Sequence, residues 1–315
     1  MHMYEELFVH PTGFLRAAVG ATLAALPLAA PCAATDICGQ TTQQLHLACQ
    51  AEVEDDFRVA RAKCLNTVDP VARRTCLADA DDSRLDSVAE CGEIRLLRQD
   101  VCAELGPGPY DPVLNPANFV VTITNPYAPF KPGKWWEYRK QTDEGIERVR
   151  VEVLDQRRQI LGIQATVVRD RVWLDGELVE DTIDWLAQDR QGNVWYLGEL
   201  ARNYEDGRLE SLDGSWEAGK NGAKPGLWMT GAPKVELFYR QEWDPGSAED
   251  VVEVESVNAP DDVPFRNSKP VLMTEDWTPL SPDGLELKFY VPGVGFVMEV
   301  EVANGETLRL VDYSR

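Results

Sequence analysis

Residues 168–199 read VRDRVWLDGELVEDTIDWLAQDRQGNVWYLGE, and this stretch decides the fold. Asp175-Gly176 is a dipeptide typical of two-residue hairpin turns, and Asp189–Asn193 turns the chain again. The segments beside these turns are rich in Val, Ile and Trp and alternate with polar residues, which is typical of half-buried strands. The stretch therefore predicts three successive antiparallel strands.

The two turns give an expected register with the cross-strand pairs Trp173–Leu178, Arg171–Glu180, Asp170–Asp181, Ala187–Trp195 and Ile183–Glu199. One face then carries Val168, Val172, Val179, Ile183, Trp185, Trp195 and Leu197, together with Asp170, Asp181 and Glu199. The opposite face carries Arg169, Arg171, Glu180 and Asp184, a salt-bridged outer surface.

Carboxylates on an apolar face break the strand pattern, and such violations concentrate at functional sites. Directly opposed Asp170 and Asp181 would raise a pKa, bind a cation or recruit a basic partner. Two simpler interpretations stay open: the register is one residue off, or a basic residue such as Arg240 neutralises the pair.

Alternation of this kind continues outward from the stretch. Short β-branched runs separated by turn residues extend from Phe119 to Arg315, and Asn304-Gly305 is the turn of a further hairpin. We expect a mainly antiparallel β domain over 119–315, built as a curled sheet, half-barrel or barrel. Gly106-Pro107-Gly108-Pro109 ends any helix before it, so residues 106–118 are interpreted as a linker.

Six cysteines precede this linker: Cys38, Cys49, Cys64, Cys76, Cys91 and Cys102. Their spacings of 11, 15, 12, 15 and 11 are symmetric about Pro70. Spacings of about 11 and 15 are close to three and four helical turns, so the cysteines of each helix share a face. Residues 35–105 are therefore predicted to form an antiparallel helical hairpin with nested bridges Cys38–Cys102, Cys49–Cys91 and Cys64–Cys76. Crossed bridges are the alternative. The predicted fold class is α+β.

Residues 1–34 have the pattern of a secretory signal peptide. Arg16 precedes the uncharged run Ala17–Ala30, and Cys32-Ala33-Ala34 provides a small-residue cleavage site. Pro31 disfavours a lipidated Cys32. Removal of this segment leaves an even number of cysteines, which together with export implies disulfides. We expect a periplasmic or extracellular protein without a transmembrane segment after signal removal.

The residue inventory excludes several function classes. Lys and Arg number 31 against 53 Asp and Glu, a net charge of −22 that argues against nucleic acid or anionic membrane as partner. Only His46 remains after signal removal, paired cysteines leave no thiol nucleophile, and no phosphate-binding or dinucleotide motif occurs. We expect no metal and no cofactor. Chemistry by a carboxylate pair, as in glycoside hydrolysis, remains open.

All nine tryptophans lie between Trp135 and Trp277, within the predicted β domain. Aromatic side chains beside acidic ones suit sugar stacking or an apolar ligand cavity, although most of the nine are expected in the core. Trp135, Trp136, Trp216 and Trp228 are predicted to be the more exposed. The candidate ligand-binding residues are Asp170, Asp181, Trp185, Trp195, Glu199, Trp216, Glu217, Trp228, Arg240 and Glu242.

Several phrases together resemble a group of exported bacterial proteins of unknown function. The resemblance covers roughly residues 110–312 and implies export and a β-rich extracytoplasmic domain, with the cysteine-rich hairpin present in only part of the group. It implies no activity, cofactor or catalytic residue. The phrases are NPY at 125–127, KPG at 131–133, EDT at 180–182, DW at 184–185, AQD at 187–189, GNVWYLGE at 192–199, GSWEAG at 214–219, GAKPG at 222–226, YRQE at 239–242 and PGVG at 292–295.

These patterns favour an exported, non-enzymatic binding protein with an aromatic, acidic β domain, whose ligand is a glycan, a lipid-like molecule or a cation. One alternative is an interaction or structural module of the cell envelope that contacts a protein partner through the hairpin. A second alternative is a carboxylate-dependent hydrolase.

Overall fold

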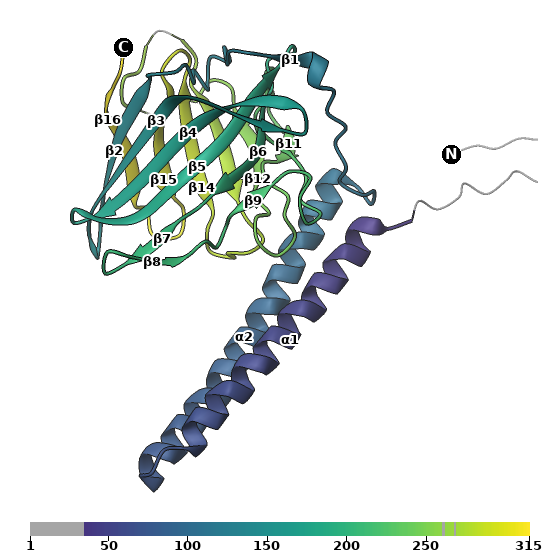
Figure 1. The fold of residues 1–315 in the computed structure, drawn as a ribbon, viewed down its shortest axis with the longest axis vertical. Coiled ribbons are helices and arrows are strands. Elements are labelled where there is room, and N and C mark those ends of the chain that lie inside the picture. Colours follow the sequence, from purple (N-terminus) through teal and green to yellow (C-terminus); the bar gives the residue numbers. More distant parts are fainter. Residues whose placement is uncertain (1–34, 260–261, 268) are drawn as a thin grey trace, which may run out of the picture. The chain divides into compact units, whose positions relative to one another are not determined.

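A computed structural model describes residues 35–259, 262–267 and 269–315 of the chain. The predicted signal peptide, residues 1–34, lies outside the described residues. Two α-helices are followed by antiparallel strands of one sheet, which is the predicted α+β class (Figure 1). The helices are α1 (Ile37–Leu65) and α2 (Pro70–Leu105), followed by the 3-10 turn η1 (Pro116–Asn118). The strands are β1 (Phe119–Val120), β2 (Trp135–Thr142), β3 (Gly145–Ile160), β4 (Ile163–Leu174), β5 (Glu177–Asp189), β6 (Val194–Leu200), β7 (Asn203–Glu205), β8 (Arg208–Ser211), β9 (Trp216–Glu217), β10 (Gly226–Met229), β11 (Phe238–Arg240), β12 (Val251–Ser256), β13 (Leu272–Trp277), β14 (Glu286–Val291), β15 (Gly295–Glu301) and β16 (Thr307–Tyr313).

Capping residues set the ends of the two helices. The carboxylate of Asp36 accepts the backbone N–H of Gly39 at the start of α1. Asp69 accepts two backbone N–H groups at the start of α2, with Pro70 at the first helical position. Gly106 ends α2 with φ at +88°, a conformation that favours glycine. Neither described helix carries an apolar stretch long enough to cross a membrane.

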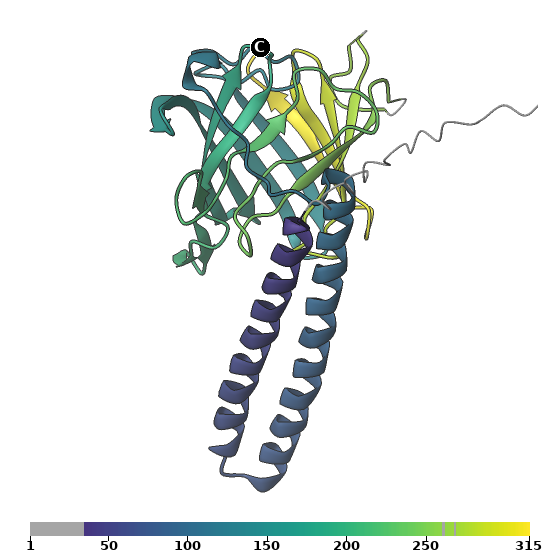
Figure 2. The same ribbon diagram turned by 90° about the vertical axis from the view of Figure 1, so that its right-hand side faces the viewer.

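Disulfides hold α1 and α2 side by side and antiparallel (Figure 2). The bridges are Cys38–Cys102, Cys49–Cys91 and Cys64–Cys76, the nested set that the spacing predicts. Few apolar side chains are buried between the helices, so the bridges take the place of a core. Disulfides persist in oxidising compartments, and three of them indicate an extracytoplasmic protein.

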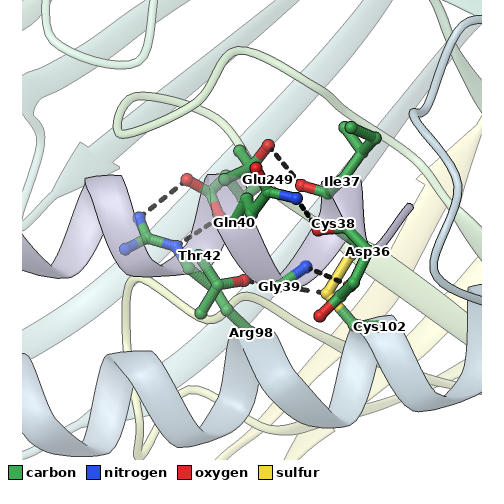
Figure 3. Close-up of a disulfide and its surroundings, with 10 residues drawn as sticks. Asp36, Ile37, Cys38, Gly39, Gln40, Thr42, Arg98, Cys102 and Glu249 are labelled. Carbon is green, nitrogen blue, oxygen red and sulfur yellow. Dashed lines mark hydrogen bonds and ion pairs between the residues drawn. A yellow bond between two sulfur atoms is a disulfide. The ribbon is translucent and has the colours of Figure 1, made fainter.

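A buried ion pair joins α2 to the β-rich part of the chain (Figure 3). The guanidinium of Arg98 donates to both carboxylate oxygens of Glu249, at 2.8 and 2.7 Å. Arg98 is 6 % exposed and Glu249 is 0 % exposed. A buried charge is tolerated only when it is paired and hydrogen-bonded. Removal of either side chain would therefore leave the other as an unpaired buried charge.

The sheet curls without closing. Its strands follow the order β10-β6-β5-β4-β3-β2-β16-β15-β14-β13-β12-β11, with β1, β7, β8 and β9 beside this path. No continuous ladder joins the end strands β10 and β11 within the described residues; an isolated bridge between Lys224 and Trp243 lies there instead. Gly226 allows this approach, since a Cβ atom at that position would clash with the backbone of Gln241.

The turn at Asp175-Gly176 forms as expected, with positive φ at both residues. Trp173 lies opposite Leu178 as predicted. An extra residue on β5 at Val179 then shifts the register by one. The predicted pairs Arg171–Glu180 and Asp170–Asp181 are therefore wrong; the observed pairs are Arg171–Asp181, Asp170–Thr182 and Val172–Glu180.

A second irregularity follows between β5 and β6. Ala187 lies opposite Trp195 as predicted, but the predicted pair Ile183–Glu199 is wrong, because Glu199 lies opposite Asp184. The shift falls at Gly198, whose φ of +131° marks a bulge on β6. The bulge at Val179 moves Glu180 and Asp184, which were expected on the outer surface, to the concave side of the sheet, and the bulge at Gly198 brings Glu199 to the same side. The hairpin at Asn304-Gly305 forms between β15 and β16.

Candidate functional site

A cavity of about 510 Å³ lies inside the curled sheet. Alternate residues of the strands line it because successive side chains of a strand point to opposite faces. On β4, for example, Val168, Asp170 and Val172 line the cavity, and Arg169 between them does not. The lining has an aromatic part and a carboxyl-rich part.

The aromatic part is one connected set of rings. Phe130 packs edge-on against Trp136 and Trp228, with ring centroids 5.6 and 5.0 Å apart. Tyr290 lies 6.3 Å from Trp228 and 5.7 Å from Phe296. Such a set of rings buries an apolar ligand surface effectively.

Phe130 belongs to the segment between β1 and β2, which is tied to the sheet by buried hydrogen bonds. The side-chain amide of Asn125 donates to the carbonyls of Gly192 and Thr230, at 2.9 Å each. The carbonyl of Pro126 accepts the N–H of Gly293 at 2.7 Å. Three of the phrases that carry the resemblance, NPY, GNVWYLGE and PGVG, therefore meet in space to hold this segment.

Within the part of the chain that the structure describes, nine carboxyl side chains and one basic side chain, Lys288, line the carboxyl-rich part. The acids come from strands far apart in the sequence, and the curl of the sheet brings them together. They are Glu147, Asp170, Glu180, Asp184, Glu199, Glu242, Asp276, Glu286 and Glu299.

Asp184 and Glu199 share one hydroxyl group. The Tyr196 oxygen lies 2.6 Å from Asp184 Oδ1 and 2.7 Å from Glu199 Oε2. A tyrosine hydroxyl has one proton to donate, so the second contact needs a proton on one of the two carboxyls. Burial raises the pKa of Asp184 to about 7, and burial together with the Asp184 charge raises the pKa of Glu199 well above its ordinary value. The three groups therefore hold a shared proton near neutral pH.

The pKa values of two further acids in the carboxyl-rich part, Asp170 and Glu242, are also raised. Burial, and next the charge of Asp184, raise the pKa of Asp170 well above its ordinary value. Asp170 Oδ1 is buried and accepts no hydrogen bond from the described residues. Burial and the neighbouring Asp250 similarly raise the pKa of Glu242.

Lys288 compensates the acids on β13–β15. Its ammonium lies 3.0 Å from Glu286, 3.6 Å from Asp276 and 3.8 Å from Glu299. Burial opposes its charge, but these carboxylates outweigh burial and raise the pKa of Lys288. Burial raises the pKa of Glu299 to about 7 despite the lysine. Asp276 is 5 % exposed, and its Oδ2 accepts no hydrogen bond from the described residues.

Four of the ten candidate residues line the cavity: Asp170, Glu199, Trp228 and Glu242. Among the other six, Asp181 points outward and accepts both hydrogen bonds of the Arg169 guanidinium, at 2.7 Å each. These bonds lower the pKa of Asp181. Glu217 is likewise neutralised by Arg158 and Lys220.

The remaining candidates also lie outside the cavity lining. The Arg158 guanidinium covers the ring of Trp185 at 4.0 Å, and Trp195 donates to Asp189 at 2.9 Å. Arg240 does not neutralise Asp170; it stacks on Trp243 at 3.9 Å. The predicted exposure of Trp136 and Trp216 is wrong, since both are buried. Trp216 packs behind the Tyr196 ring, with centroids 5.4 Å apart.

The sequence reasoning missed most of the cavity. Asp184 and Glu180 were assigned to the wrong face, and Tyr196 was not considered. No local signal selects Lys288, Asp276 or Glu299, because their importance arises only when β13–β15 curl toward β4–β6. Among the described residues, no three His, Cys, Asp or Glu side chains are arranged to hold a metal ion.

Comparisons with known proteins give little further information. No protein-family model matches the chain, and no curated protein matches it. One solved structure, described as a "putative lipoprotein" from Parabacteroides distasonis, aligns over 59 % of this chain and 96 % of its own, with 11 % sequence identity and a TM-score of 0.28. A similarity of this size carries no argument about fold or function. Membership of the group that the sequence resembles stays a prediction.

Proposed function

We propose that this is an exported, non-enzymatic binding protein whose small-molecule ligand occupies the cavity of the curled sheet. The observation that carries the proposal is the cavity itself: about 510 Å³, with connected aromatic rings in one part and nine carboxyl groups in the other. Ligand cavities typically measure about 300–1,000 Å³ and combine apolar walls with a few convergent polar groups.

A purely structural interior would not contain these acids. Burial of a carboxyl group opposes its ionisation and costs free energy unless the group is paired. Among the described residues, Lys288 is the one cation that lines the cavity, and none of them donates a hydrogen bond to Asp170 Oδ1. Departures from the rules of core packing are concentrated at functional sites, so the acids support a binding role.

The proposal includes export to the periplasm or the extracellular space. The three disulfides support it, because they need an oxidising compartment to form and persist. Residues 1–34 would then act as the signal peptide, and N-terminal sequencing of the exported protein should give a first residue at or near Thr35.

A ligand panel tests the binding function. Soluble glycans, lipid-like compounds and organic cations would be screened for their effect on the melting temperature of the mature protein. We expect one class to stabilise the wild type and the Trp195→Leu variant, whose change lies outside the cavity lining, but not Trp228→Leu, whose change lies in it. If no compound stabilises the protein, or if Trp228→Leu responds like the wild type, the proposal is wrong.

A further inference from the structure

The charges that line the cavity are not balanced. Lys288 offsets Asp276, Glu286 and Glu299, and it lies 3.0–3.8 Å from their oxygens. Glu147 is paired with Lys140, which lies outside the lining, at 3.7 Å. The other five carboxyl groups in the lining have no basic side chain among the described residues that line the cavity with them.

The uncompensated acids are concentrated on β4–β6. Asp170, Glu180, Asp184 and Glu199 lie there, and Glu242 follows β11. Glu180 Oε1 accepts the Thr182 hydroxyl at 2.7 Å, and Asp184 and Glu199 share the Tyr196 hydroxyl. These neutral donors leave acceptor capacity unused, since an ionised carboxylate offers about four acceptor positions.

One buried acceptor atom indicates where a donor is missing. Asp170 Oδ1 on β4 is buried and accepts no hydrogen bond from the described residues, and the Asp170 side chain lines the cavity. On β13, Asp276 Oδ2 instead faces the Lys288 ammonium at 3.6 Å. Leaving a buried acceptor unsatisfied is costly, whereas a charged donor placed beside it gives a strong hydrogen bond.

We infer that the ligand is an organic cation, a protonated amine that carries an apolar or aromatic body. Its ammonium group lies beside Asp170, Asp184 and Glu199 and offsets their charge. The Lys288 ammonium offsets the charge of the acids on β13–β15 in the same way. The body of the ligand packs against Phe130 and Trp228. This inference rests on the proposed binding function and names the ligand class for the same cavity.

Other ligand classes fit the lining less well. An anion would be repelled by the carboxylates, and a neutral glycan would leave their charge uncompensated. A metal ion needs several oxygen ligands converging on one point, and no three acidic side chains are so arranged among the described residues. An ammonium group instead donates to acceptors in several directions, and aromatic rings nearby add a favourable cation–π interaction.

Three probes with a common phenethyl body isolate the effect of charge: 2-phenylethylamine, 2-phenylethanol and 3-phenylpropanoate. Their affinities would be measured by isothermal titration calorimetry at mildly alkaline pH, because a higher pH favours the ionised form of the carboxyls. We expect the amine to bind at least about 10-fold more tightly than the alcohol, since a charge-assisted hydrogen bond contributes more than a neutral one. The carboxylate probe should not bind.

Variants locate the ammonium group. Asp170→Asn and Glu199→Gln keep the side-chain shapes and should each weaken amine binding by about 10-fold or more. The exposed Glu205 on β7 lies outside the cavity lining, so Glu205→Gln is the matched control and should bind the amine like the wild type. Circular dichroism and melting curves would confirm that every variant is folded.

Each other outcome overturns a stated part of the inference. Equal binding of alcohol and amine would reject the cation while leaving the cavity as a binding site. Amine binding that survives both cavity variants would place the amine elsewhere. If none of the three probes binds but another compound of the broader panel does, the ammonium site is wrong and the binding function stands. If nothing binds in either experiment, both are wrong.

Discussion

Asp184→Asn should make the stability of the protein less dependent on pH. The Asp184 carboxyl is hydrogen-bonded to Tyr196, and burial raises its pKa from the ordinary value of 3.8 to about 7. The folded protein therefore keeps a proton that the unfolded chain releases between about pH 4 and 7, so the free energy of unfolding falls as pH rises through this window. Asparagine does not ionise, so the free energy of unfolding of the variant should not fall for this reason.

The pKa shift sets the size of the effect. An increase from 3.8 to about 7 corresponds, at about 1.4 kcal/mol per unit, to at most about 4 kcal/mol. The variant should therefore resemble the wild type near pH 4 and exceed its stability by up to about 4 kcal/mol near pH 8. The acids around Asp184, namely Glu180 on β5, Asp170 on β4, Glu199 on β6 and Glu242 after β11, stay in both proteins. The difference between the two curves therefore reports the ionisation of Asp184 together with its electrostatic effect on these neighbours.

Urea denaturation at a series of pH values would measure the effect, with equal m-values as the criterion for comparing stabilities. Asp213→Asn, which changes an exposed residue outside the cavity lining, provides the control and should follow the wild-type curve. Parallel curves for wild type and Asp184→Asn would refute the assignment of a shared proton to the Asp184–Tyr196–Glu199 group.

Three further changes test other parts of the structure. Lys288→Ala should destabilise the protein by about 3 kcal/mol because it leaves the buried Asp276 and the partly buried Glu286 and Glu299 without their cation. Added ethylammonium should restore part of the lost melting temperature, whereas added sodium at the same concentration should not. Asn125→Ala should cost about 2–4 kcal/mol in urea denaturation, since it removes the donor to the buried carbonyl of Thr230 and to the partly buried carbonyl of Gly192. An unchanged stability would show that the segment before β2 is not held as described. Glu249→Gln should cost about 3 kcal/mol or more by leaving the buried Arg98 guanidinium uncompensated, and a loss below about 0.5 kcal/mol, the size typical of exposed ion pairs, would contradict this.

Features that depend on short-range rules could be predicted from the sequence. Cysteine spacing near whole numbers of helical turns gives the nested disulfides about Pro70, because a helix has a fixed period. The turns at Asp175-Gly176 and Asn304-Gly305 form because both dipeptides tolerate positive φ. The cross-strand pairs predicted next to the turns are also observed, as for Trp173–Leu178 and Ala187–Trp195.

The faces of the strands could not be predicted, because each bulge reverses which side chains point inward. The bulge at Val179 has no marker in the sequence. The bulge at Gly198 does have one, since an isolated glycine within a strand often indicates a bulge. Recognition of that signal would have placed Asp184 opposite Glu199.

The composition of the cavity depends on the curl of the whole sheet. Asp170 and Lys288 line one cavity although they are more than a hundred residues apart in the sequence, because β4 and β14 both belong to the curled sheet. Local patterns carry no information about such neighbours. The sequence therefore indicated that acids and tryptophans matter in this domain, but it identified only Asp170, Glu199, Trp228 and Glu242 within the cavity lining.

A crystal structure of the mature protein with 2-(4-bromophenyl)ethylamine tests the central claim most directly, because anomalous scattering locates the bromine atom independently of interpretation of the remaining density. We predict the bromine among Phe130, Trp228 and Tyr290, with the ammonium nitrogen within hydrogen-bonding distance of Asp184 or Glu199. A bromine position outside the cavity, or a cavity without the amine when calorimetry shows binding, would contradict the account.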